Sequence, residues 1–197
     1  KMPFKPRWVM YLSIWTRFPF CPLPKSSEKV AASSLNSTSH CLSSADGWLL
    51  LNNPIEALGE LQKIDPEDRS TSEYLETEWR VHADLEQWDL GLELAQRLME
   101  AYPENTSGYI LRSYALRRAP KGSLEAAREA LLEAAAKFPR EPIIPYNLAC
   151  YAAQEGHLKE ARTFLRMALE IGDRKQLIRM ARRDEDLKPL WEELKNS

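Results

Sequence analysis

Apolar residues recur at the spacing of an α-helix along most of the chain after residue 45. The clearest stretch, residues 142–173, reads PIIPYNLACYAAQEGHLKEARTFLRMALEIGD and contains two amphipathic runs separated by a short turn. Leu148 in the first run and Leu165 in the second lie on the apolar stripes of two helices that could pack together. Gly156 ends the first run, at a position where helices often need a positive φ. This stretch therefore predicts an antiparallel helical hairpin.

The same periodicity predicts helices throughout the rest of this region. Asn53 followed by Pro54 has the sequence of a helix N-cap and first turn. Glycine is scarce, at 7 of 197 residues, and this composition also favours helix. The predicted helices span residues 55–64, 72–85, 90–101, 107–118, 124–138, 146–154, 158–171, 175–182 and 186–194. The predicted fold class is therefore all-α.

Proline residues that end predicted helices recur at a nearly constant interval. They stand at positions 66, 103 and 139, with spacings of 37 and 36 residues, and Asp173 follows the last by 34. A period near 34 with two helices in each unit indicates a helical repeat. One hairpin cannot bury both faces of its helices, whereas stacked hairpins share a continuous core. We therefore expect an α-solenoid of stacked antiparallel helix pairs.

The last predicted helices, within residues 175–194, have the character of a cap on this array. Leu187, Leu190 and Trp191 lie on one side and are expected to face the preceding repeat, with polar residues outside. We thus expect a C-terminal capping helix after about three to three and a half repeats.

Individual positions of the repeat resemble the tetratricopeptide repeat (TPR) family. In residues 142–173 the matching positions are Tyr146, Asn147, Leu148, Ala149, Gly156, Ala161, Ala168 and Leu169. The middle unit matches at Tyr109, Ser113, Ala127, Leu131, Ala134 and Pro139. The unit before it departs at two positions, because Gly91 replaces an alanine and Trp79 stands where the family usually has a small residue. The resemblance covers about residues 46–194.

The resemblance implies a TPR-like superhelix whose first helices line a concave groove that holds a peptide or partner segment. Carried over position by position, it gives the partner-binding residues Thr77, Arg80, Tyr114, Arg117, Tyr146, Asn147 and Gln154. Asn147 matches an asparagine that commonly binds the peptide backbone in the family. Arg80 and Arg117 with Tyr114 favour an acidic or aromatic segment, through charge and stacking.

The resemblance also argues against one kind of partner. Family members that read chaperone C-termini clamp the terminal carboxylate with a lysine and an arginine on one first helix. The matching positions here hold Ser107 and Leu111, or Ile143 and Asn147. We therefore do not predict binding of chaperone tails.

Charge is distributed unevenly along the chain. Residues 1–45 hold six basic residues and one acidic residue, a net charge of +5, whereas residues 46–197 hold 21 basic and 28 acidic residues, a net charge of −7. The acidic second part argues against nucleic-acid binding. Cys21, Cys41 and Cys150 show neither a disulfide framework nor a metal-ligand spacing, which favours a reducing cytoplasm. No run of about 18 apolar residues occurs, so no membrane-spanning helix is predicted.

The N-terminal part leaves several interpretations open. Residues 1–45 are predicted to be a poorly ordered, basic, Pro/Ser-rich segment, and residues 46–197 to be the TPR-like domain. Residues 1–25 are an unstructured or unrelated upstream tail, an export signal, or a segment that docks on a membrane surface or a partner. Residues 26–44 contain eight serines and resemble a linker. The first predicted helix, residues 55–64, has the place of a second helix in a repeat. Residues 30–51 are an alternative source of the first helix that would pair with it.

The sequence carries no recognisable catalytic constellation. It contains no Gly-rich phosphate loop, Cys-x-x-Cys or Gly-x-Ser-x-Gly motif, and its histidines are widely separated. Cys150 is expected to be a packed thiol. We predict a non-catalytic protein–protein interaction scaffold with a protein or peptide partner, no cofactor and no metal. The alternatives are a secretion chaperone for an exported protein and a membrane-associated assembly factor anchored by the N-terminal segment.

Overall fold

The structure is a computed structural model that describes the backbone of residues 31–195 and the side chains of residues 37–194. The interpretations of residues 1–25 lie outside the described residues. Every element in the described range is helical. The α-helices are α2 (Ala31–Leu50), α3 (Pro54–Gln62), α4 (Ser72–Asp84), α5 (Trp88–Ala101), α6 (Thr106–Leu116), α7 (Leu124–Lys137), α8 (Ile143–Gln154), α9 (Leu158–Ile171), α10 (Arg174–Ala181) and α11 (Trp191–Lys195), with 3₁₀ helices η1 (Pro66–Ser70) and η2 (Glu185–Leu190).

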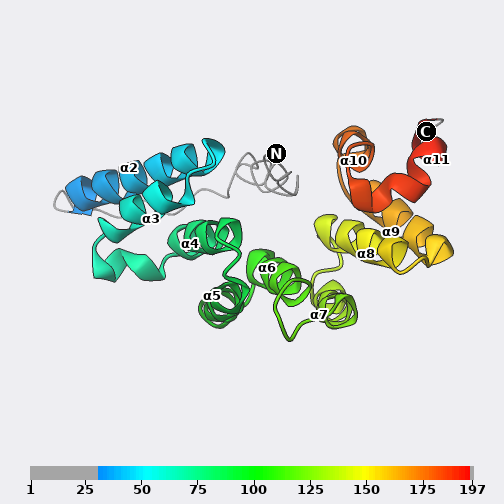
Figure 1. Ribbon diagram of the computed structural model, residues 1–197, viewed down its shortest axis with the longest axis horizontal. Coiled ribbons are helices and arrows are strands. Elements are labelled where there is room, and N and C mark those ends of the chain that lie inside the picture. The colour runs from blue at the N-terminus through cyan, green and yellow to red at the C-terminus, as the bar shows by residue number, and fades with distance from the viewer. Residues whose placement is uncertain (1–30, 196–197) are drawn as a thin grey trace.

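Successive helices pack against one another along an arc (Figure 1), with α2 and α10 at its two raised ends. Helices α4, α6 and α8 lie toward the inner side of the arc, whereas α5 and α7 lie on its outer side (Figure 1). The all-α solenoid predicted from the repeat period is confirmed. Within residues 31–195, no helix has the length and hydropathy needed to span a membrane.

The turns between paired helices follow the sequence signals closely. Asn53 caps α3, where its side chain accepts a hydrogen bond from the amide of Glu56 at 3.4 Å. Gly156 has φ of 80° between α8 and α9, a conformation that costs a glycine little because it has no Cβ. These local signals fix where each helix ends and allow the next helix to fold back.

Buried apolar residues form two clusters along the arc. One cluster is built mainly on α2 to α5 and the other on α7 to α11, and both include residues from α6. Tyr114 on α6 packs against both clusters. The core is thus continuous through α6, as stacking of repeats requires.

The pair Trp79 and Gly91 explains why one repeat departs from the family pattern. Trp79 on α4 is fully buried. A Cβ at position 91 on α5 would lie 3.3 Å from the Trp79 Nε1 atom and 3.6 Å from the Cβ of Ala115. The glycine therefore makes room for the indole, so the two unusual residues compensate each other and the hairpin keeps its packing.

Helix α2 supplies the first helix of the array. It packs on α3 and α4, and Cys41, Ala45 and Leu49, four residues apart, are buried. The sequence-based domain boundary at residue 46 falls inside this helix. The serine content of this helix suggests a linker. Its small and apolar residues stand at helical spacing and pack on α3 and α4, and this packing stabilises the helix.

The C-terminal cap differs in detail from the single helix predicted over residues 186–194. Pro189 lies inside η2, where it cannot donate a backbone hydrogen bond, and regular α-helix starts only at Trp191. Leu187, Leu190 and Leu194 are buried, which confirms the capping role. The half-buried Trp191 donates its Nε1–H to the carbonyls of Ala181, at 2.9 Å, and Asp184, at 3.2 Å.

Candidate partner-binding site

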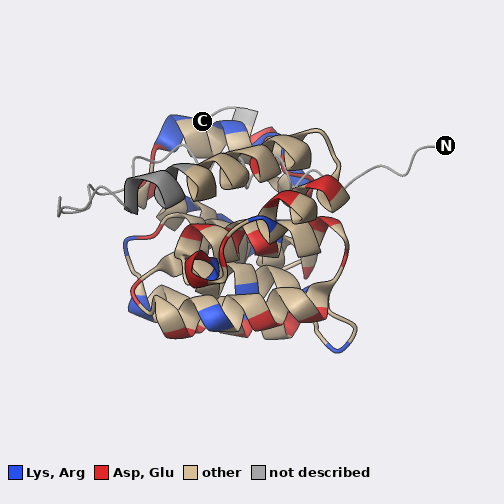
Figure 2. Cartoon of the chain, turned by 90° about the vertical axis from the view of Figure 1, so that its left-hand side faces the viewer, with Lys and Arg blue, Asp and Glu red and all other residues tan. Residues whose placement is uncertain are grey.

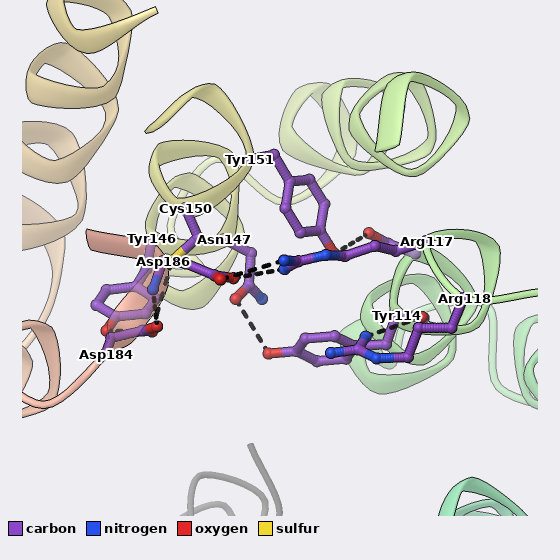
Figure 3. Close-up of polar contacts among 10 residues, drawn as sticks. Tyr114, Arg117, Arg118, Tyr146, Asn147, Cys150, Tyr151, Asp184 and Asp186 are labelled. Carbon is purple, nitrogen blue, oxygen red and sulfur yellow. Dashed lines mark hydrogen bonds and ion pairs between the residues drawn. The ribbon is translucent and has the colours of Figure 1, made fainter. Parts of the chain in front are cut away.

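A network of polar side chains lies where α6, α8 and the segment between α10 and η2 meet (Figure 3). At its centre, the Tyr114 hydroxyl on α6 donates to Oδ1 of Asn147 on α8 at 3.0 Å. Asn147 is only 4% exposed, and its Nδ2 has no hydrogen-bond acceptor among the described residues. A buried amide donor without an acceptor costs free energy, and an acceptor supplied by a ligand would remove that cost.

The sequence around Asn147 explains how a polar side chain comes to be buried. Helix α8 is flanked by α7, α9 and η2, and its residues from Ile143 to Ala153 are all buried. Cys150 lies four residues after Tyr146 and three after Asn147, so it shares a side of the helix with each of them. In Figure 3 this side faces η2 and α6.

Arg117, at the C-terminal end of α6, is held by the C-terminal cap. Its two terminal nitrogens donate to the two carboxylate oxygens of Asp186, at 2.5 and 3.2 Å. The guanidinium also lies 5.4 Å from the centre of the Tyr151 ring. Burial by itself would lower the pKa of Arg117, but hydrogen bonding to Asp186 and its negative charge raise it above the usual value. The Arg117 charge is therefore fully engaged within the chain.

Asp184 is held by neutral donors. Its Oδ2 accepts from the Tyr146 hydroxyl at 3.0 Å and from the Cys150 thiol at 3.5 Å, and its Oδ1 accepts from the amide of Asp186 at 3.1 Å. Burial, followed by the charge of Asp186, raises the pKa of Asp184. Burial also raises the pKa of Cys150, which is therefore an unreactive packed thiol, as predicted.

The described part of the chain contains one group of possible metal ligands: Cys150, Asp184 and Asp186. Each offers one ligand atom, and these atoms lie within 4.8 Å of one another. These atoms already have partners. Arg117 neutralises Asp186, and Tyr146 donates to Asp184. The trio therefore has the geometry of a polar packing cluster, and we assign it no metal.

On α4 the predicted residues form a separate group. Arg80 donates to Oδ1 of Asp46 on α2 at 2.6 Å and to the hydroxyl of Thr77 at 2.8 Å. Nearby, Glu76 accepts from the Ser107 hydroxyl at 2.6 Å and from the Asn105 side chain at 3.4 Å. Burial raises the pKa of Glu76 above its usual value.

The structure thus brings together four of the seven predicted residues: Tyr114, Arg117, Tyr146 and Asn147. Thr77 and Arg80 lie on α4 in the group with Asp46, and Gln154 is exposed at the end of α8. Sequence reasoning did not place Asp184 and Asp186 in this site. The sequence separation of 69 residues between Arg117 and Asp186 leaves no local pattern from which their contact could be read.

The fold is that of a TPR array, and solved structures of such proteins match it over most of the chain. TTC0263, a thermophilic TPR protein of Thermus thermophilus, matches with a TM-score of 0.60 and 20% identity, covering 80% of this chain and 95% of that one. A double mutant of MamA RS-1 matches with a TM-score of 0.54 and 18% identity, covering 85% and 84%. MamA AMB-1 matches with a TM-score of 0.52 and 15% identity, covering 84% and 92%. Neither the family models nor the curated proteins contain a match to the sequence.

Proposed function

We propose that this chain is a non-catalytic scaffold that binds an extended segment of a protein partner along the inner face of α4, α6 and α8. The observation that carries the proposal is the buried Asn147 side chain, whose oxygen is used by Tyr114 and whose amide hydrogens have no acceptor in the described part of the chain. A peptide carbonyl is the acceptor that an extended segment presents most often, and it carries no sequence requirement. The TPR fold, which generally serves protein interaction, supports the same proposal.

The polar surroundings of Asn147 support a fixed, preorganised contact. Tyr114 fixes the orientation of the Asn147 side-chain amide, because its hydroxyl donates to Oδ1 at 3.0 Å. Asn147 lies on a helix packed on several sides, so little conformational entropy remains to be lost on binding.

The proposal is tested by selecting random peptides displayed on phage against the full chain. Selected peptides are expected to bind the wild type and to lose at least about tenfold in affinity for Asn147→Ala, because the amide donor is gone. Tyr114→Phe is the matched control, since it removes the hydrogen bond that orients Asn147 but leaves the amide hydrogens, and it should cost less. Circular dichroism and denaturant unfolding check that each variant is folded. Failure to select any peptide, or equal binding by Asn147→Ala, would refute the proposal.

A further inference from the structure

We infer that the inner face prefers a basic partner segment, and that Asp186 of the C-terminal cap sets this preference by taking up the charge of Arg117. The inference rests on the proposed function and specifies the chemistry of its partner. A basic segment takes the place of the acidic one that Arg80 and Arg117 suggested from the sequence. Three features carry it: the pairing of Arg117, three carboxylates whose hydrogen bonds come from neutral donors, and the position of Asn147 beside the segment that carries Asp184.

The first feature is that Asp186 makes the contact that an acidic partner would need. A guanidinium binds a carboxylate best through two parallel hydrogen bonds, and Asp186 makes both of them with Arg117. The side chains are only 19% and 26% exposed, so water screens the pair weakly. An acidic partner would therefore have to displace Asp186, which is anchored by the buried Leu187 next to it. Arg80 is likewise paired, with Asp46 at 2.6 Å.

The second feature is a set of three carboxylates that accept hydrogen bonds from neutral groups and form no ion pair with a described residue. Asp184 accepts from Tyr146, Cys150 and a backbone amide. Glu76 accepts from Ser107 and Asn105. Glu141, just before α8, accepts from the amide of Ile143 at 3.2 Å and the hydroxyl of Thr106 at 3.5 Å.

Burial raises the pKa of each of these three carboxylates, Glu76, Glu141 and Asp184, although the charge of Arg80 partly opposes it at Glu76. A cation brought by a partner would oppose the effect of burial further. Residues 46–103 hold 14 acidic and four basic residues, a net charge of −10, so the field on the α4 side has the same sign. Figure 2 faces this end of the array and shows acidic residues on several of its helices.

The third feature is a possible backbone contact beside Asp184 and Asp186. The Asn147 amide lies between Tyr114 and the segment that carries Asp184 and Asp186 (Figure 3). A segment whose carbonyl accepts from Asn147 would carry its neighbouring side chains past Asp184 on one side and toward α4 on the other. Lysine and arginine side chains are long enough to reach such carboxylates, and acidic side chains would be repelled by them.

The test uses two fluorescein-labelled octapeptides, (Lys-Gly)₄ and (Glu-Gly)₄, with the full chain at low ionic strength. The wild type is expected to bind the lysine peptide at least about tenfold more tightly than the glutamate peptide. Asp186→Asn should raise the affinity for the glutamate peptide several-fold, because Arg117 then lacks a charged partner. The double variant Arg117→Gln/Asp186→Asn should lose that gain.

Matched controls separate the inner face from overall charge. Glu185→Gln removes the same charge from an exposed neighbour whose only ion pair within the described residues is with Lys188, at 3.8 Å, and it should leave both affinities unchanged. Glu76→Gln keeps an oxygen that accepts from Ser107 and should weaken binding of the lysine peptide. Glu93→Gln, on the exposed side of α5, should leave that binding unchanged.

The outcomes distinguish this inference from the proposed function. No preference for the lysine peptide, no binding of either peptide, or equal effects of Asp186→Asn and Glu185→Gln would overturn the inference. If selected peptides depend on Asn147 while the charge variants have no effect, the inference alone fails. If the charge variants behave as expected while Asn147→Ala binds normally, the proposed backbone contact fails and the charge preference stands.

Discussion

Substitution of Gly91 tests the packing that joins α4 to α5. Gly91 leaves room for the indole of Trp79, which stands where the family usually has a small residue. A Cβ at position 91 would already lie 3.3 Å from Nε1 and 3.8 Å from Cδ1 of Trp79, and 3.6 Å from Ala115. Gly59, in the middle of α3, is the matched control, because a Cβ there meets nothing within 4 Å.

The expected magnitudes follow from two opposing effects. Replacing a helical glycine by alanine stabilises a helix by about 0.5–1 kcal/mol, and Gly59→Ala should show this gain in full. Gly91→Ala should show little of it, because Trp79 must shift by a few tenths of an ångström. Gly91→Leu adds three further carbons to a filled space and should cost about 3 kcal/mol.

Urea denaturation followed by circular dichroism measures these differences in the free energy of unfolding. The combination Trp79→Ala/Gly91→Leu should be more stable than the sum of the two single changes predicts, since the leucine then occupies space vacated by the indole. The packing argument is wrong if Gly91→Leu and Gly59→Leu have the same stability, or if the double variant is strictly additive.

Three further predictions concern hydrogen bonds and ionisation. Ser113→Ala should cost about 1–3 kcal/mol, because the buried Tyr151 hydroxyl loses its partner at 2.8 Å, and adding Tyr151→Phe should recover part of the loss in the same urea assay. Trp191→Phe should cost about 1 kcal/mol through the lost bonds to Ala181 and Asp184; an unchanged thermal midpoint would contradict this. Burial raises the folded-state pKa of Glu76, so folding favours the protonated carboxyl. The stability that this carboxyl contributes is fully present below its unfolded pKa and is lost as pH rises through its folded pKa. Glu76→Gln should therefore match the wild type near pH 4 and exceed it in stability at pH 7; the reverse order would refute the burial argument.

The repeat period and local signals were enough to predict the helices of the array. Prolines, Asn53 and Gly156 act within one turn of the chain, so their effect is visible in the sequence. Packing of α2 was harder to predict, because Cys41, Ala45 and Leu49 stand among serines and are buried only by contact with α3 and α4. Propensity is a weak guide where such tertiary contacts decide the structure.

The candidate site was predicted in part for the same reason. Family positions placed Tyr114, Tyr146 and Asn147 on the inner face, because repeat spacing determines which residues of a first helix point there. Pairing between elements is not encoded by that spacing. Asp186 reaches Arg117 only because the cap folds back onto α8 and α6, so the partner of that arginine became visible only in three dimensions.

The side-chain amide of Asn147 offers the most direct test of partner binding on the inner face. Its ¹H–¹⁵N resonances in the full chain can be assigned by their loss in Asn147→Ala and followed while a peptide from the display selection is added. Hydrogen bonding to a peptide carbonyl should shift these resonances and slow their exchange with water, together with shifts on α4, α6 and α8. Unchanged Asn147 resonances, with shifts confined to α5, α7 or α9, would contradict binding on the inner face.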